Sequence, residues 1–141
     1  KPSVTVKDGN TTLKNGTKYT VSYGTNKSTG KAYVKITGKG NYTGSITKYF
    51  NIVPKTPTVS ISAGKRSATI TAKATGASGY EISYATSKNG KYKVVTSSSQ
   101  RKTINKLTRG KNYYVKVRAY KLIDGKKVYS GYSSVRIVKV Q

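Results

Sequence analysis

Few side chains in this sequence could carry out chemistry. The 141 residues contain no His and no Cys, which excludes a catalytic triad, a thiolate nucleophile and the common zinc sites. The carboxylates are Asp8, Glu81 and Asp124, and nothing in their spacing argues that two of them meet, as glycosidase chemistry requires. Asp8-Gly9-Asn10 lacks the further acids of a calcium loop. We therefore expect no enzyme, no metal site and no cofactor.

One glycine-rich stretch, GKGNYTG at residues 38–44, has the glycines of a phosphate-binding loop. Such a loop needs a helix after it, because the N-terminus of that helix holds the anion. The residues that follow, 45–53, read SITKYFNIV and indicate a strand. We therefore interpret the stretch as a hairpin connection whose glycines supply positive φ angles.

Charge points to binding instead. Against three acids stand 28 Lys and Arg residues, which give a formal net charge of +25. This field attracts polyanions such as nucleic acid, teichoic acid, acidic polysaccharide or an acidic protein face. Alternatively, the lysines are solvated strand faces that keep an all-β protein soluble. We expect nucleic acid to bind only nonspecifically, because no nucleic-acid reading module is recognised, and we expect no membrane insertion.

Strands must position these side chains. Apolar and polar residues alternate in 19–23 and 31–37, which is typical of half-buried strands, and no stretch shows a convincing helical period. Pro54 and Pro57 interrupt the pattern, since proline cannot donate to a central sheet ladder. We predict an all-β protein of two antiparallel sandwich modules, residues 1–54 and 57–141, joined by a short linker at 55–56.

The second module is expected to form seven short strands, which favours a sandwich of two antiparallel sheets. The predicted ranges are 58–62, 67–74, 79–85, 92–96, 102–105, 112–120 and 128–138. Alternation along the sixth range directs Tyr113, Val115, Val117 and Ala119 toward the core, because alternate residues share a side.

The same alternation leaves aromatic and basic residues on an outward stripe, where Tyr and Arg favour contacts with proteins, sugars or bases. The alternative is a solvated strand whose side chains pair across the sheet. Asp124-Gly125 favours a tight hairpin that lifts two apolar residues toward a loop tip, although these residues could also fold back on the sandwich. The predicted ligand-binding residues are Tyr114, Lys116, Arg118 and Tyr120 on the stripe, Lys91 and Lys93 in a basic turn, and Leu122 and Ile123.

The stretch LTRGKNY at residues 107–113, followed by apolar residues at alternate positions, resembles the corner between strands E and F of fibronectin type III domains. The resemblance covers about 85 residues. It implies that the Tyr113 hydroxyl caps this corner, with Leu107 and Gly110 as further structural residues.

GYEISY at residues 79–84 is similar to strand C of the same family, with Tyr80, Ile82 and Tyr84 directed inward. The sequence departs from the family at Ala72, where a Trp is usual. The departure implies either a less well filled core or a core filled there by Tyr80 or Tyr84.

Residues 1–54 resemble an immunoglobulin-like repeat of Gram-positive secreted and cell-surface proteins. The resemblance rests on VTVKDG at 4–9, LKNGTKYTVSY at 13–23 and the GKGNYTG stretch. Such repeats usually begin some twenty residues earlier with a further strand, so the resemblance implies a partial module. An unpaired sheet edge of this kind could add a strand from another chain.

Together these observations predict a non-catalytic binding or adhesion segment of a bacterial, Gram-positive protein that is secreted or displayed at the cell surface. The expected partner is a host protein, such as an immunoglobulin or an extracellular-matrix glycoprotein. Two alternatives stay open. One is a structural spacer that holds another domain off the cell wall and rests its basic charge on wall polyanions. The other is carbohydrate binding on a platform of Tyr residues.

Overall fold

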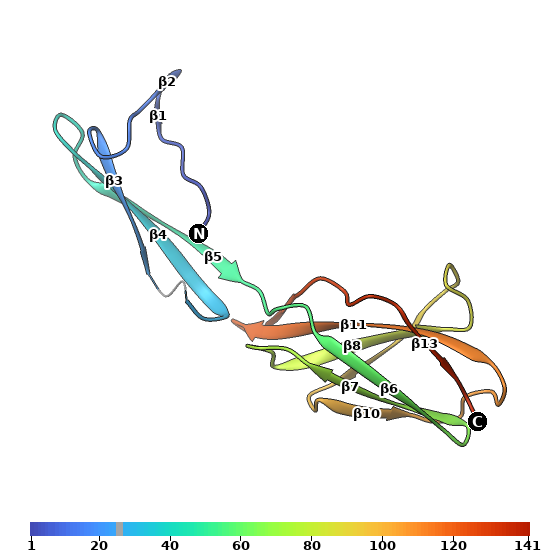
Figure 1. The fold of residues 1–141 in the computed structure, drawn as a ribbon. Helices are drawn as coiled ribbons and strands as arrows, with labels where there is room; N and C mark the ends of the chain where they lie inside the picture. The colour runs from blue at the N-terminus through green and yellow to red at the C-terminus, as the bar shows by residue number, and fades with distance from the viewer. Residues whose placement is uncertain (25–26) are drawn as a thin grey trace. The chain divides into compact units, whose positions relative to one another are not determined.

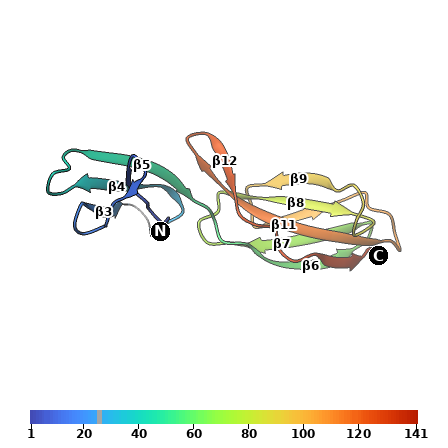
Figure 2. The ribbon, with the colours of Figure 1, turned by 90° about the horizontal axis from the view of Figure 1, so that it is seen from above.

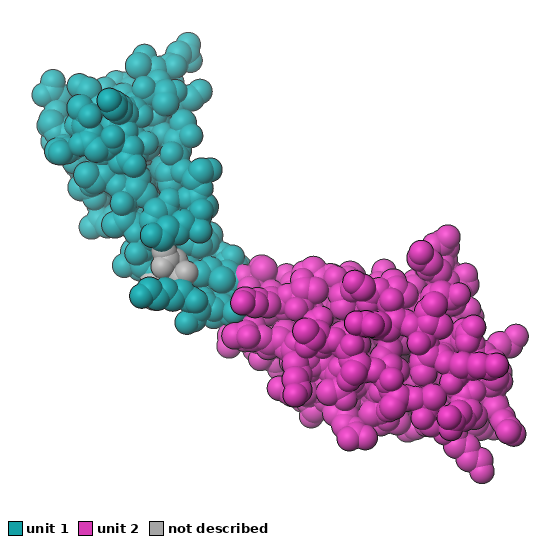
Figure 3. All heavy atoms as spheres, in the orientation of Figure 1, with its two compact units in different colours: residues 1–52 teal, residues 53–141 magenta. Residues whose placement is uncertain are grey.

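The computed structural model describes residues 1–24 and 27–141, and these residues form strands and no helix (Figure 1). Consequently no helix in the described chain is long and apolar enough to cross a membrane. The chain falls into two compact units, unit 1 (Lys1–Ile52) and unit 2 (Val53–Gln141) (Figure 3).

The boundary between the units lies after Ile52, whereas the first module was expected to end at residue 54. Residues 55–56, the expected linker, group with unit 2. Pro54 and Pro57 are both buried. A proline ring can be buried at little cost because it brings no N–H group that needs a partner.

Unit 1 contains a short hairpin, whose two strands have two residues each, and a three-stranded antiparallel sheet. The hairpin pairs β1 (Lys7–Asp8) with β2 (Thr11–Thr12), and the sheet has the order β3 (Tyr19–Gly24), β4 (Gly30–Gly38), β5 (Ser45–Ile52). The GKGNYTG stretch connects β4 to β5, and the φ angles of Gly40 and Gly44 are 68° and 81°. The interpretation of this stretch as a hairpin connection is confirmed.

Unit 2 is a sandwich of two antiparallel sheets (Figures 1 and 2). One sheet has the order β10 (Arg101–Ile104), β7 (Ser67–Lys73), β6 (Thr58–Gly64). The other has the order β12 (Lys126–Tyr129), β11 (Asn112–Ile123), β8 (Gly79–Ala85), β9 (Lys93–Ser97), and β13 (Arg136–Lys139) also pairs with β11. The all-β fold predicted from the alternation of residues is confirmed.

The core of unit 2 lies between the sheets, where Ile70, Ile82, Val115 and Val117 are at most 2% exposed. Tyr80 belongs to the same buried cluster as Ala72, and Tyr84 packs against it. The Tyr80 hydroxyl accepts a hydrogen bond from the Ala74 N–H at 3.1 Å, so its polar end is satisfied. Tyrosine rings thus contribute to a core that contains no Trp.

The strand predicted over 128–138 is wrong, because β12 ends at Tyr129 and β13 begins at Arg136. Between them, Ser130 and Ser133 attach the chain to β11. The Ser130 N–H donates to the Ala119 carbonyl (2.8 Å), and the Ser130 Oγ accepts from the Ala119 N–H (2.9 Å). Ser133 bonds Val117 in the same way, at 2.7 and 3.0 Å. Here serine hydroxyls replace part of the backbone hydrogen bonding between strands. The alternation of residue types does not reveal such a replacement.

β11 continues three residues beyond its predicted end and forms a hairpin with β12. Asp124 and Gly125 make the turn with φ angles of 50° and 75°, which suits the twist of a two-residue hairpin. Figure 2 shows the hairpin extending past the start of β8, whose first residue, Gly79, pairs with Tyr120. The turn expected at Asp124-Gly125 is confirmed.

Candidate functional site

The outward face of the sheet in unit 2 carries the predicted stripe. Tyr114, Lys116 and Arg118 are half-buried and alternate with the four buried core residues of β11. Tyr120 differs from the expectation, since it is only 8% exposed. The Tyr129 ring lies against it, with 6.0 Å between centroids, and the cross-strand neighbour Gly79 leaves room for it. Tyr120 is therefore covered by its neighbours.

Basic and aromatic side chains stack alternately on this face. The Lys116 Nζ lies 4.6 Å from the ring centroid of Tyr92 and 4.7 Å from that of Tyr132. The Arg118 Cζ lies 3.8 Å from the Tyr129 centroid and 4.8 Å from that of Tyr132. We call these five residues the aromatic–cation ladder. Each contact of this kind contributes about 0.5–1 kcal/mol at an exposed site, so the ladder holds its side chains in one arrangement.

An acid lies beneath the ladder. Glu81 is 7% exposed, and its Oε1 accepts hydrogen bonds from the Arg118 Nε at 2.7 Å and the Tyr132 hydroxyl at 3.0 Å. Burial by itself would raise the pKa of Glu81, but hydrogen bonding from Tyr132, Arg118 and Tyr129 and the charge of Arg118 hold that pKa below its usual value. Glu81 thus stays ionised and serves to anchor the ladder.

Sequence reasoning missed the segment that supplies two ladder rings. Residues 129–133 read YSGYS, and the two tyrosines of this segment, Tyr129 and Tyr132, stack with Arg118. The two serines, Ser130 and Ser133, make the bonds to β11 described above. The signal in the sequence was the repeated Tyr-Ser pair, three residues apart, which combines an aromatic group with a short hydroxyl at a constant interval.

Two apolar side chains flank the ladder on the same face. Val94 pairs with Ser83 across the sheet, and Ile137 pairs with Tyr114. Val94 is 54% exposed and Ile137 is 60% exposed. The face therefore combines accessible apolar groups with rigid aromatic and cationic ones, a composition that suits a contact with another macromolecule.

Lys91 and Lys93 do not join this face. In the register of β8 and β9, Lys93 is opposite Tyr84, which packs toward the core, whereas the adjacent Tyr92 stacks with Lys116 on the outward side. Both lysines line a cavity of about 470 Å³ at one end of unit 2, together with Lys106. The predicted basic turn is therefore separate from the stripe.

Leu122 and Ile123 are the last residues of β11, opposite Lys127 and Lys126 of β12. Leu122 is 51% exposed, and Ile123 is half-buried. They lie on the arm of the hairpin, next to the turn, rather than in a loop.

The corner before β11 is closed by Tyr113. Its hydroxyl accepts a hydrogen bond from the Thr108 N–H at 3.1 Å, and the residue is 8% exposed. That bond lowers the pKa of Tyr113, while burial opposes the change and the Thr108 hydroxyl and the Lys93 charge add to it. Leu107 is buried nearby in the core cluster, and Gly110 has a φ angle of 76°.

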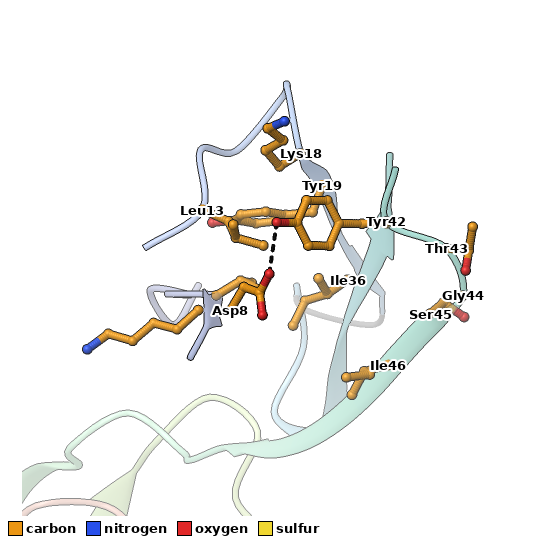
Figure 4. Close-up of a pocket in the computed structure, with 13 residues that line it drawn as sticks. Asp8, Leu13, Lys18, Tyr19, Ile36, Tyr42, Thr43, Gly44, Ser45 and Ile46 are labelled. Carbon is orange, nitrogen blue, oxygen red and sulfur yellow. Dashed lines mark hydrogen bonds between the residues drawn. The ribbon is translucent and has the colours of Figure 1, made fainter. Parts of the chain in front are cut away.

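Unit 1 has a smaller cavity of about 240 Å³ between its N-terminal segment and the sheet (Figure 4). Leu13, Tyr19 and Ile36 contribute apolar surface to it. The Tyr42 hydroxyl donates to the Asp8 Oδ2 at 3.1 Å, and this hydrogen bond is the main reason that the pKa of Tyr42 is raised. Asp8 therefore ties the N-terminal segment to the connection between β4 and β5.

The three acids do not gather. Glu81 is paired with Arg118, Asp8 lies in unit 1, and Asp124 is in the β11–β12 turn. The described residues contain no group of three His, Cys, Asp or Glu side chains that could hold a metal ion.

Comparison with known proteins gives a family match over residues 46–136, to the model described as "Interferon-alpha/beta receptor, fibronectin type III". A human fibronectin type III domain, derived from the KIAA0970 protein, is 21% identical to this chain, with a TM-score of 0.49. The match covers 62% of this chain and 72% of the chain of that domain. A fibronectin type III-like protein from Clostridium thermocellum is 24% identical to this chain, with a TM-score of 0.49. The match covers 64% of this chain and 93% of the chain of that protein. No curated protein matches the chain.

Proposed function

From the premise that this chain belongs to the fibronectin type III family of the matched model, we propose that it is a non-catalytic binding segment of a bacterial protein. In this proposal the parent protein is secreted or displayed on a Gram-positive cell, and unit 1 is an immunoglobulin-like repeat. Unit 2 recognises a host protein, such as an immunoglobulin or a matrix glycoprotein.

The outward face around the aromatic–cation ladder is the observation that carries the proposal. It brings Val94 and Ile137, both more than half exposed, to the same face as Tyr114 and Lys116. Since the ladder already orders its rings and cations, little side-chain entropy is lost when a partner binds there. A rigid aromatic and apolar patch of this composition favours a protein partner.

The test uses the full chain immobilised at about 0.15 M salt, with purified immunoglobulin G and purified fibronectin as probes. We expect one of them to bind, and the double variant Val94→Ser/Ile137→Ser to weaken that binding by about tenfold or more, because central apolar contacts often account for more than 1 kcal/mol each. The five residues of the aromatic–cation ladder stay intact in this variant, so the ladder is preserved.

The matched control is Tyr49→Ser/Val53→Ser, which removes two other apolar side chains, 66% and 48% exposed, that belong to neither β9 nor β13. It should leave the affinity within about twofold. If the immobilised chain retains neither probe, or if the two double variants lose affinity equally, a host-protein contact on this face is contradicted.

A second candidate is a spacer that rests on wall polyanions, and the charge distribution favours it. Nine lysines and Asp8 give unit 1 a charge of +8, and nineteen basic residues with Glu81 and Asp124 give unit 2 a charge of +17. In this case a purified teichoic acid polymer binds with a steep salt dependence. Neither double variant should change that binding, which distinguishes the spacer from the host-protein contact.

A further inference from the structure

The cavity of about 470 Å³ in unit 2 is lined by several lysines. It lies where β8 ends, beside the connection from β10 to β11. Lys91, Lys93 and Lys106 line it, and no carboxylate is among its lining residues. The acids of unit 2 are elsewhere, with Glu81 paired to Arg118 on the outward face. A negative ligand would therefore meet three cations.

Lys93 also acts on a residue that lines the cavity. The backbone hydrogen bond from Thr108 is the main cause of the lowered pKa of Tyr113, and the charge of Lys93 adds to it. Lys93 is on the inner side of β9 because it pairs with Tyr84. The strand register thus turns Lys93 to the inner side of the sheet, where it lines the cavity.

Lys106 is held in a left-handed backbone conformation, with a φ angle of 59°. For a residue with a Cβ atom this costs about 1–2 kcal/mol, and such strain is common at binding sites. The next residue, Leu107, fixes the loop, because its N–H donates to the Arg66 carbonyl at 2.9 Å and its side chain is buried. Lys106 therefore lines the cavity from a loop that is fixed at the next residue.

The remaining lining suits a sugar. Asn105, Thr86 and Thr108 supply an amide and two hydroxyl groups, and Tyr84 and Tyr113 supply aromatic surface. Hydroxyl and amide groups bond sugar hydroxyls, while aromatic rings pack on the C–H groups of a pyranose. The volume lies within the roughly 300–1,000 Å³ that is usual for small-ligand sites, and a bare phosphate would leave most of it empty.

We propose that this cavity binds an anionic sugar residue, carboxylated or sulfated, of an acidic polysaccharide. The three lysines hold the anionic group, and the polar and aromatic lining holds the ring. The site is separate from the outward face that carries the proposed protein contact, so each proposal can fail while the other stands.

The experiment measures binding to the full chain by titration calorimetry at about 0.15 M salt. The probes are a heparin-derived hexasaccharide, which is sulfated, and a galacturonic acid hexamer, which is carboxylated. Maltohexaose serves as the neutral sugar and inorganic polyphosphate as the anion without sugar. We expect at least one acidic hexasaccharide to bind with clearly higher affinity than maltohexaose and polyphosphate. The acidic hexasaccharide that binds more tightly shows whether the site prefers a sulfate or a carboxylate group.

The test variant is Lys91→Gln/Lys93→Gln/Lys106→Asn, in which Asn is chosen because it tolerates the left-handed conformation. The matched control is Lys55→Gln/Lys73→Gln/Lys126→Gln. These three lysines are exposed, and they lie toward the other end of unit 2, since Lys73 ends β7 opposite Thr58 and Lys126 begins β12. Both variants lose the same charge.

We expect the test variant to weaken binding of the acidic hexasaccharide by about tenfold or more, and the control by about threefold or less. The slope of log affinity against log salt should fall by about two to three in the test variant only. Equal losses in the two variants, absence of acidic-sugar binding, or polyphosphate binding with the same dependence on the three lysines would overturn the proposal.

A second measurement needs no variant. Heteronuclear NMR of the wild-type chain should show shifts of the amide signals at residues 105–108 when the hexasaccharide is added. Shifts that are confined to residues of the outward face would overturn the assignment of the cavity. The Val94→Ser/Ile137→Ser variant should bind the hexasaccharide as the wild type does.

Discussion

Arg118 contacts one oxygen of Glu81 with two nitrogen atoms: its Nε donates a hydrogen bond to the Oε1 atom at 2.7 Å, and its Nη2 forms an ion pair with the same oxygen, also at 2.7 Å. The two residues are cross-strand partners in β11 and β8, so the register of the sheet creates the pair. Through this contact Glu81, which is 7% exposed, holds Arg118 of the aromatic–cation ladder in place. It also makes the ladder sensitive to changes in a residue that no partner would touch.

We expect Glu81→Gln to lower the free energy of unfolding by about 1–2 kcal/mol, because Arg118 loses its counter-charge while an acceptor for Tyr132 remains. Urea unfolding followed by circular dichroism measures the change. Lys102→Gln, an exposed charge change on the other sheet, should stay within about 0.5 kcal/mol. Equal stability of Glu81→Gln and wild type would contradict the anchoring role.

The pH dependence of stability should follow from the lowered pKa of Glu81. Its contribution is complete above the unfolded-state pKa of about 4.3 and is lost as the pH falls through the lower folded-state pKa. The difference in free energy of unfolding between wild type and Glu81→Gln should therefore shrink between about pH 5 and about pH 2. A difference that stays constant over this range would be inconsistent with an ionised Glu81 in the folded state.

Tyr113→Phe removes the hydroxyl that accepts the Thr108 N–H at 3.1 Å. We expect a loss of about 1–2 kcal/mol, because the N–H of a partly buried corner is left without its acceptor. Thermal unfolding measures the loss. Tyr114→Phe removes a hydroxyl from the next, outward-facing position and should change the stability by less than about 0.5 kcal/mol. Similar effects of the two variants would show that the corner hydroxyl is not specifically stabilising.

Ser130→Ala and Ser133→Ala each remove an acceptor from a β11 backbone N–H, that of Ala119 and that of Val117. Each change should cost about 1–2 kcal/mol, since the N–H groups lie where β11 has no ladder partner on that side. Hydrogen exchange should become faster at the Ala119 and Val117 amides. Ser134→Ala is the control. Unchanged exchange in both test variants would argue against the hydrogen bonds from β11 to the Ser130 and Ser133 hydroxyls.

Gly79→Ala tests the close approach of β8 and β11. A Cβ atom at this position would lie 2.7 Å from the Ser97 carbonyl oxygen and would also overlap the end of the Tyr120 side chain. We expect a loss of about 1–3 kcal/mol in urea unfolding, because the sheet must shift to make room. Gly131→Ala meets only ordinary contact, 3.4 Å to the Thr56 Oγ1, and should be nearly neutral. Tolerance of Gly79→Ala would show that Tyr120 packs elsewhere in solution.

The local pattern of the sequence determined the strands. A period of two depends only on which residue types are neighbours in the chain, so it predicted which side of β11 is buried, and a short turn motif predicted the hairpin at Asp124-Gly125. The composition also limited the possible chemistry, because a chain without His or Cys lacks the side chains that most catalytic and zinc sites need.

Only the tertiary structure decided which side chains meet. Tyr92 precedes β9 and Lys93 begins it, but the two residues face opposite sides of the sheet, because the pairing of Lys93 with Tyr84 turns it toward the cavity. Glu81 finds Arg118 through cross-strand register. The YSGYS segment does not form regular backbone pairs with β11, because serine hydroxyls take the place of some backbone groups there. Such partners lie tens of residues apart, so register and loop geometry select them, and local residue patterns carry no information about either.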